Sequence, residues 1–193
     1  MSAIPNLRRL ATRFRAADTG VAAVEFALVL PIMLLVYIGM VEGSALISMD
    51  RKIQSVSGAV GDLVARSDGE ITTATLNDYV KVAGGIMTPY PSDGLEQIVT
   101  QVRVLANRTT SVDCSKRYVN QVLQATGARE EDEEYEGLPD EIIDIALGQY
   151  VIVAESSYSY SPLYGIVFDQ PVNLYRENFY LPRFGAQIEL DPP

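Results

Sequence analysis

The sequence GVAAVEFALVLPIMLLVYIGMVEGSALISM, residues 20–49, is the longest apolar stretch in this chain of 193 residues. An α-helix rises about 1.5 Å per residue, so this stretch is long enough to cross the hydrocarbon core of a bilayer, which is about 30 Å thick. The preceding residues 1–19 are rich in arginine, whereas the chain that follows is acidic. Basic flanks tend to stay in the cytoplasm. We therefore expect one transmembrane helix in a bacterial inner membrane, with the N-terminus in the cytoplasm and the C-terminal domain in the periplasm.

The composition excludes several classes of function. The formal net charge of -10 argues against a nucleic-acid partner, because the phosphates would be repelled. The chain has no histidine and a single cysteine, Cys114, which excludes a Cys/His zinc site, a Ser-His-Asp triad and an internal disulfide. We expect no metal and no cofactor. Cys114 is expected to be a small buried apolar residue, with an intermolecular disulfide as the alternative.

Glu25 is the most informative residue of the apolar stretch. A carboxylate inside a membrane helix costs about 2.5–3.5 kcal/mol on insertion scales, and such residues usually have a function. A secretory signal is cut after its apolar run, but here the small residue Gly20 lies before it. Cleavage after Gly20 would place a positive amine on Val21, and Glu25 would be the fifth residue of the new chain. The two charges could neutralise each other within one chain or between neighbouring chains, and such a pair would fix the register of packing.

The run GVAAVEFAL, residues 20–28, resembles the N-terminus of type IV prepilins. With the basic leader before it and Pro31 after it, it is more closely similar to the TadE/TadG-like proteins of the tight adherence (Flp) pilus system. The resemblance implies cleavage between Gly20 and Val21 by a prepilin peptidase, and it assigns Glu25 and Phe26 to processing and assembly. The alternative is a plain signal anchor in which Glu25 snorkels to the membrane surface.

Three further residues of the helix are candidates for contacts with other helices. Pro31 removes one backbone hydrogen bond and can kink the helix. Gly39 and Gly43 form a small-xxx-small pair, which lets two helices approach closely. Glu42, near the outer end, is expected to face lipid headgroups or a partner.

The helix is expected to continue beyond the membrane. Apolar residues recur at spacings of three and four from residue 49 to residue 64, which predicts an amphipathic helix packed on a domain. Gly69 is a candidate cap. The predicted organisation is a basic cytoplasmic leader (residues 1–20), a transmembrane and amphipathic helix (21–68) and an extracytoplasmic α+β domain (69–193).

The outer domain is predicted to be a small antiparallel sheet of about four strands with one or two short helices. Helices are expected at residues 71–87 and 138–147, and strands at 96–106, 111–119, 150–161 and 172–181. Residues 118–123 fit either a strand or a helix. The acidic run EEDEEYE, residues 130–136, is expected to be a solvated, mobile loop, because blocks of like charge usually are. A calcium site is the alternative, although the Asp-x-Asp-x-Asp-Gly spacing of a calcium-binding loop is missing.

The resemblance to TadE/TadG-like proteins returns near the C-terminus. The residues concerned are the valine-rich strand, YSYSPL at residues 158–163 and FYLPR at 179–183, in which Leu181 departs from the usual arginine. The resemblance thins between residues 107 and 137. The tyrosines are expected to be core residues whose hydroxyl groups reach water.

Two classes of function remain. The first is a pilin-like subunit, a minor pilin or pseudopilin, whose partners would be the prepilin peptidase, other pilins, pilus-assembly proteins of the inner membrane and the lipid bilayer. The alternative is an unprocessed single-span membrane protein with a periplasmic binding or scaffold domain. We expect no enzymatic activity, because no Ser-x-x-Lys motif places Lys81 or Lys116 beside a nucleophile.

Overall fold

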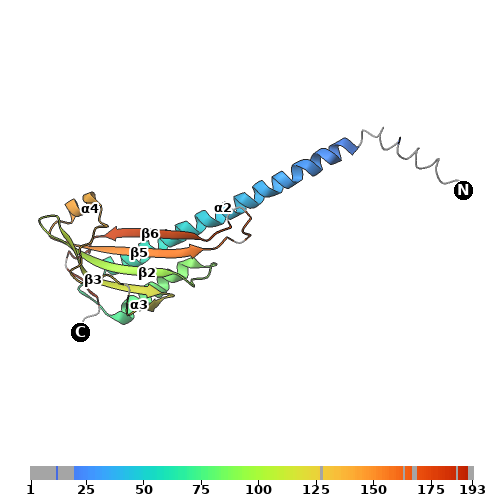
Figure 1. Cartoon of the computed structure of the whole chain (residues 1–193). Coiled ribbons are helices and arrows are strands. Elements are labelled where there is room, and N and C mark those ends of the chain that lie inside the picture. Colours follow the sequence, from blue (N-terminus) through green and yellow to red (C-terminus); the bar gives the residue numbers. More distant parts are fainter. Residues whose placement is uncertain are drawn as a thin grey trace.

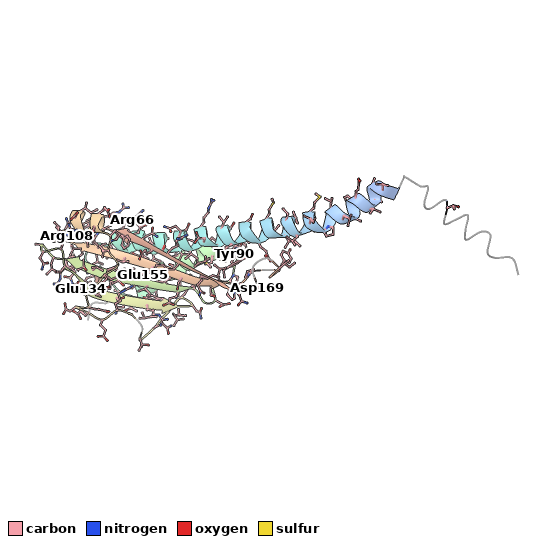
Figure 2. All side chains as sticks on the ribbon, turned by 45° about the horizontal axis from the view of Figure 1, so that its top comes forward. Arg66, Tyr90, Arg108, Glu134, Glu155 and Asp169 are labelled. Atoms are coloured by element: carbon pink, nitrogen blue, oxygen red, sulfur yellow. The ribbon has the colours of Figure 1, made fainter. Side chains whose placement is uncertain are left out.

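The long N-terminal helix is the largest element of the computed structural model, which describes residues 12, 20–126, 128–162, 164–166, 169–185 and 187–190. The predicted basic leader, except residues 12 and 20, lies outside these residues. Helix α2 (Val21–Ala65) is 45 residues long, and its first half projects from the domain (Figure 1). Figure 2 shows Tyr90 and Asp169 near the point where α2 leaves the domain, and Arg66 and Arg108 at the opposite end.

The end of α2 differs from the prediction in one detail. The amide groups of Arg66 and Ser67 donate to carbonyl groups of the last turn, so Arg66 is the C-cap. Gly69 is therefore not the cap. It lies in the following loop with φ of 81°, and its carbonyl accepts a hydrogen bond of 2.7 Å from the amide of Glu189.

The main sheet has five strands in the order β4-β3-β2-β5-β6, and every neighbouring pair is antiparallel. The strands are β2 (Glu96–Val104), β3 (Thr110–Val119), β4 (Val122–Leu123), β5 (Tyr150–Tyr160) and β6 (Val172–Tyr180). The predicted α+β class is confirmed. Residues 118–123, which the sequence left open, form the end of β3, a turn at Asn120 and Gln121 with positive φ at both residues, and β4.

Smaller elements complete the domain around the main sheet. Strand β1 (Glu70–Ile71) pairs in parallel with β7 (Glu189–Leu190). Helix α3 (Thr73–Gly84) follows, with the Thr72 side chain accepting a hydrogen bond from the Thr75 amide, and the 3-10 helix η2 (Gly85–Met87) continues it. The predicted helix therefore begins later than residue 71, because Ile71 belongs to β1.

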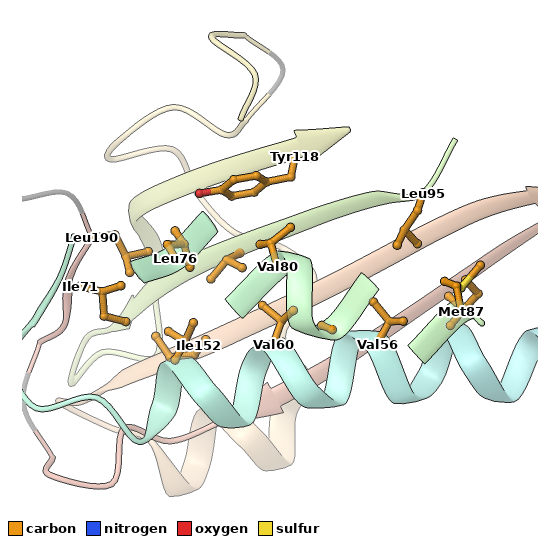
Figure 3. Packing of buried hydrophobic residues seen from close by; sticks show 14 of the residues in the cluster. Val56, Val60, Ile71, Leu76, Val80, Met87, Leu95, Tyr118, Ile152 and Leu190 are labelled. Carbon is orange, nitrogen blue, oxygen red and sulfur yellow. The ribbon is translucent and has the colours of Figure 1, made fainter. Parts of the chain in front are cut away.

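The main core lies between the sheet and the helices α2 and α3 (Figure 3). Val56 and Val60 of α2, Ile152 of β5, and Leu76 and Val80 of α3 all belong to one apolar cluster. All five side chains are almost fully buried. The amphipathic half of α2 was predicted from the spacing of its apolar residues. It packs on the sheet and forms one side of the main core.

A second apolar cluster covers part of the opposite face of the sheet. Val102 and Val104 of β2 pack there with Tyr135 and with residues around the short helix α4 (Asp140–Ile145). Both faces of β2 are therefore buried. The polar side chains of Gln97 and Gln101 are almost fully buried as well, and the Gln101 side chain accepts a hydrogen bond of 3.0 Å from the Ile188 amide.

The acidic run is not a free loop. Its carboxylates are exposed, as expected, but the backbone is joined to β3, because the amide of Val112 donates to the carbonyl of Glu133 (2.7 Å) and the amide of Asp132 donates to the carbonyl of Val112 (2.8 Å). Tyr135, the only apolar residue in the run, is 5% exposed. Burial of this ring holds the run against the sheet, which corrects the expectation of a mobile loop.

Candidate functional site: the exposed half of the N-terminal helix

The first half of α2 contains no buried residue. From Val21 to Val41 every side chain is exposed or half-exposed, and Glu42 is the first buried residue of the helix. This segment of α2 is long and apolar enough to cross a membrane once. We call residues 21–41 the exposed half and residues 42–65 the packed half.

Glu25 and Phe26 lie on the surface of the exposed half. Phe26 is 61% exposed, and Glu25 is exposed as well. Within the described residues, Glu25 forms no hydrogen bond or ion pair. It lies one turn after Val21, so the two residues share a face of the helix. The carboxylate is thus free to meet a charge at the start of its own helix or on a neighbouring chain.

Pro31, Gly39 and Gly43 also lie on the helix as the sequence places them. Pro31 is inside α2, and the helix continues through it without interruption. A Cβ atom added at Gly43 would meet no atom within 4 Å. Gly39 and Gly43 are both half-buried, and they lie next to the buried Glu42.

Glu42 marks the junction between the two halves of α2. Its side chain is 2% exposed, and a carboxylate oxygen accepts a hydrogen bond of 3.2 Å from the amide of Ile166 in the β5–β6 loop. The expectation that Glu42 faces headgroups or a partner is wrong. The amide that binds Glu42 belongs to a residue 124 positions away in the sequence, and local patterning cannot reveal such a contact.

A close helix-to-sheet contact lies in the packed half, at two glycines that were not predicted to matter. A Cβ atom on Gly61 would lie 2.5 Å from the ring of Tyr180 in β6, and the Tyr180 hydroxyl donates to the carbonyl of Gly58 (3.0 Å). The signal was present in the sequence, because Ser57, Gly58, Gly61 and Ala65 form a stripe of small residues on the helix.

A charged network occupies the sheet face opposite α2. Arg129 forms an ion pair with both oxygens of Glu155, and its guanidinium lies 4.9 Å from the centre of the Tyr135 ring. Glu155 is 5% exposed and also accepts a hydrogen bond of 2.7 Å from the Tyr175 hydroxyl. Burial first, and then this bonded carboxylate, raise the pKa of Tyr175 well above its usual range. The opposite charges of Arg129 and Glu155 neutralise each other, so this pair serves to hold the fold together.

The described residues contain no group of three His, Cys, Asp or Glu side chains arranged to hold a metal ion. Cys114 is half-buried and unpaired, and burial, assisted by Asp113, raises the pKa of its thiol to about 11. The thiol is therefore protonated at neutral pH and is a poor nucleophile.

Comparison with known proteins identifies the long helix. Residues 20–60 match the model of the family described as TadE-like protein. This helix is TadE-like. The resemblance found in the sequence is thereby confirmed, and the family consists of components of tight adherence pili and is not a known family of enzymes. No curated protein and no solved structure gives a significant match to the chain.

The TadE-like match covers both halves of α2. It begins at Gly20, runs through the exposed half and includes most of the residues that pack on the sheet. An apolar helix of this kind suits a single-pass membrane anchor that carries the folded domain at its end.

Proposed function

We propose that this chain is a pilin-like subunit, a minor pilin or pseudopilin, that takes part in assembling a tight adherence pilus. A prepilin peptidase removes residues 1–20, and the helix that begins at Val21 holds the protein in the inner membrane with its domain in the periplasm. The observation that carries the proposal is the TadE-like match, which starts at residue 20, directly beside the bond that we expect to be cut.

The helix itself supplies the physical reason for assembly. Its exposed half contains no fully buried residue, so it is available to lipid before assembly and to neighbouring helices afterwards. A charged amine on Val21 and the carboxylate of Glu25 are each costly in hydrocarbon when alone. Their pairing between neighbours favours one axial register, and Gly39 and Gly43 let the helices approach closely.

The first experiment is the mass of the N-terminal peptide from membrane-extracted protein, in cells with and without the prepilin peptidase. We expect the chain to begin at Val21 only when the peptidase is present. A chain that keeps residues 1–20 in both strains would contradict the proposal and would favour the alternative, an unprocessed anchored scaffold protein.

The second step tests Glu25. We expect Glu25→Ala to be cleaved normally but to be lost from sheared pili, because the Val21 amine would be left unpaired in the membrane, at a cost of several kcal/mol. Glu25→Asp keeps the charge and should retain part of the recovery. Glu189→Ala, which removes an exposed carboxylate in β7, is the control and should be recovered like the unmodified protein.

A further inference from the structure

We propose that the end of the domain nearest the projecting helix is a second membrane contact, which rests among the lipid headgroups of the bilayer that α2 crosses. We call it the juxtamembrane surface, and it consists of Tyr90, Pro91, Tyr164 and Ile166. The inference rests on the proposed function in one respect: it requires that the exposed half of α2 spans a membrane.

The length of the exposed half fixes the depth of the neighbouring loops. Residues 21–41 extend about 31 Å as a helix, which matches a hydrocarbon core of about 30 Å. The hydrocarbon therefore ends near Glu42. Because the Ile166 amide is hydrogen-bonded to Glu42, Tyr164 and Ile166 lie at this same boundary.

The exposure of these two side chains is unexplained by the domain alone. Tyr164 is 57% exposed and Ile166 is 58% exposed. Tyrosine is enriched where membrane meets water, because its ring is apolar and its hydroxyl group is polar. An apolar surface that continues directly from the lipid-facing side of α2 suits lipid as its occupant.

A cavity opens beside the same boundary. Its volume is about 370 Å³, and it is lined by Ala45 and Met49 of α2, by Tyr90 and Pro91, and by residues 158–161 at the end of β5. Ala45 and Met49 lie about 5 and 10 Å beyond Glu42 along the helix. The headgroup layer is about 5–8 Å thick on each side of a bilayer, so the Ala45 side of the cavity lies at headgroup depth and the Met49 side lies just beyond it.

The lining of the cavity has the amphipathic character of a headgroup environment. Tyr158 and Tyr160 supply aromatic faces, and Ser159 and Ser161 supply hydroxyl groups. Burial raises the pKa of Tyr160, and the nearby Tyr90 and Glu42 raise it further, which is consistent with these groups lying together. A contact here, beside the helix axis, would add a second point of attachment and so fix the tilt of the domain on the membrane.

The absence of tryptophan from the chain makes the test direct. Single variants Tyr164→Trp, Ile32→Trp and Phe184→Trp of the full chain are reconstituted in phosphatidylcholine vesicles. The lipids carry bromine, a quencher of tryptophan fluorescence, near either the headgroup end or the terminal end of the acyl chains. Ile32 lies at the middle of the exposed half. Phe184 is 61% exposed and lies at the far end of the domain, because the neighbouring Arg183 amide bonds the carbonyl of Ala65.

We expect Tyr164→Trp to show blue-shifted emission and to be quenched more strongly by bromine near the headgroups than by bromine at the chain ends. Ile32→Trp should show the reverse order, and Phe184→Trp should lose no fluorescence in either lipid.

Emission from Tyr164→Trp that resembles that of Phe184→Trp, while Ile32→Trp is quenched, would overturn this inference alone. A blue shift that grows with protein density without quenching by lipid would also overturn it, in favour of a second protein chain. If Ile32→Trp is not quenched either, α2 is not in the bilayer, and both the inference and the proposed anchor fail.

Discussion

The ion pair between Arg129 and Glu155 is the interaction for which a single substitution has the clearest consequence. The Glu155 side chain is 5% exposed and that of Arg129 is 29% exposed. Removing one partner of a buried pair leaves an uncompensated charge, which typically costs about 3–5 kcal/mol. We therefore expect Arg129→Met to lower the free energy of unfolding by about 3 kcal/mol at neutral pH, measured by urea denaturation.

The matched control is Arg108, which also contacts two carboxylates, Asp140 and Asp144, but with side chains that are about half exposed or more. Solvent screens such pairs, so Arg108→Met should change the free energy of unfolding by less than about 1 kcal/mol. Equal losses for Arg129→Met and Arg108→Met would show that burial of Glu155 is unimportant. The double variant Arg129→Met with Glu155→Gln should be more stable than the sum of the single losses predicts.

At the scale of elements, the contact between α2 and β6 depends on Gly61. A Cβ atom at this position would overlap the Tyr180 ring and would lie 3.0 Å from the Cβ of Ala154. Gly61→Ala should therefore push the helix from the sheet and lower the free energy of unfolding by about 1–3 kcal/mol, as overpacked cores do. Thermal unfolding followed by circular dichroism in detergent measures the effect.

Gly58→Ala is the control in the same helix, because an added Cβ would only reach ordinary contact at 3.5 Å from the Tyr180 hydroxyl. Alanine favours a helix over glycine by about 1 kcal/mol, so this variant should be as stable as the unmodified chain or slightly more stable. A loss for Gly58→Ala as large as that for Gly61→Ala would mean that the close approach at Gly61 is not the cause.

At the scale of the whole molecule, the division of α2 predicts which part the domain needs. The buried residues of the helix begin at Glu42 and include Met49, Ile53, Val56 and Val64. A chain that starts at Val41 should therefore fold and remain in solution without detergent. A chain that starts at Arg66 should not fold, because it lacks the helix side of the main core.

Circular dichroism measures whether the two shortened chains fold, and gel filtration measures whether they stay in solution without aggregating. The chain from Val41 should unfold cooperatively, with a melting temperature within about 5 °C of the full chain, since the removed part of α2 contains no fully buried side chain. Aggregation of this chain would show that the exposed half of α2 supports the domain.

The sequence was most informative where structure depends on neighbouring residues. The apolar run, the amphipathic half of α2 and the alternation in β2 and β5 are local patterns, and each corresponds to an observed element. Their partners are not local. The carboxylate of Glu42 accepts a hydrogen bond from the amide of Ile166, and the acidic run is held by the burial of Tyr135 against β3. Buried glutamines in β2 were missed for the same reason, because the groups that bind them come from other parts of the chain.

The candidate site was predicted from the sequence for residues that lie on the same helix, but not for a residue whose partner lies on the sheet. Glu25, Phe26, Pro31, Gly39 and Gly43 all lie on one continuous helix, so the sequence alone places them in relation to one another. Gly61 was not recognised, because its importance depends on the ring of Tyr180 across the helix-sheet interface. A stripe of small residues indicates close approach, but it does not identify what approaches.

The continuity of α2 also determines how the protein responds to mechanical load. A helix of 45 residues is about 68 Å long, and here it passes from the exposed half into the core without a hinge. Traction on its N-terminal end would act along the helix axis and would shear the whole interface with β5 and β6 at once, whereas a hinge would allow the contacts to peel apart one by one. Rotation of the exposed half would likewise turn the sheet by the same angle. The helix is therefore a rigid connection, and it transmits to the domain any force or torque that is applied to its free end.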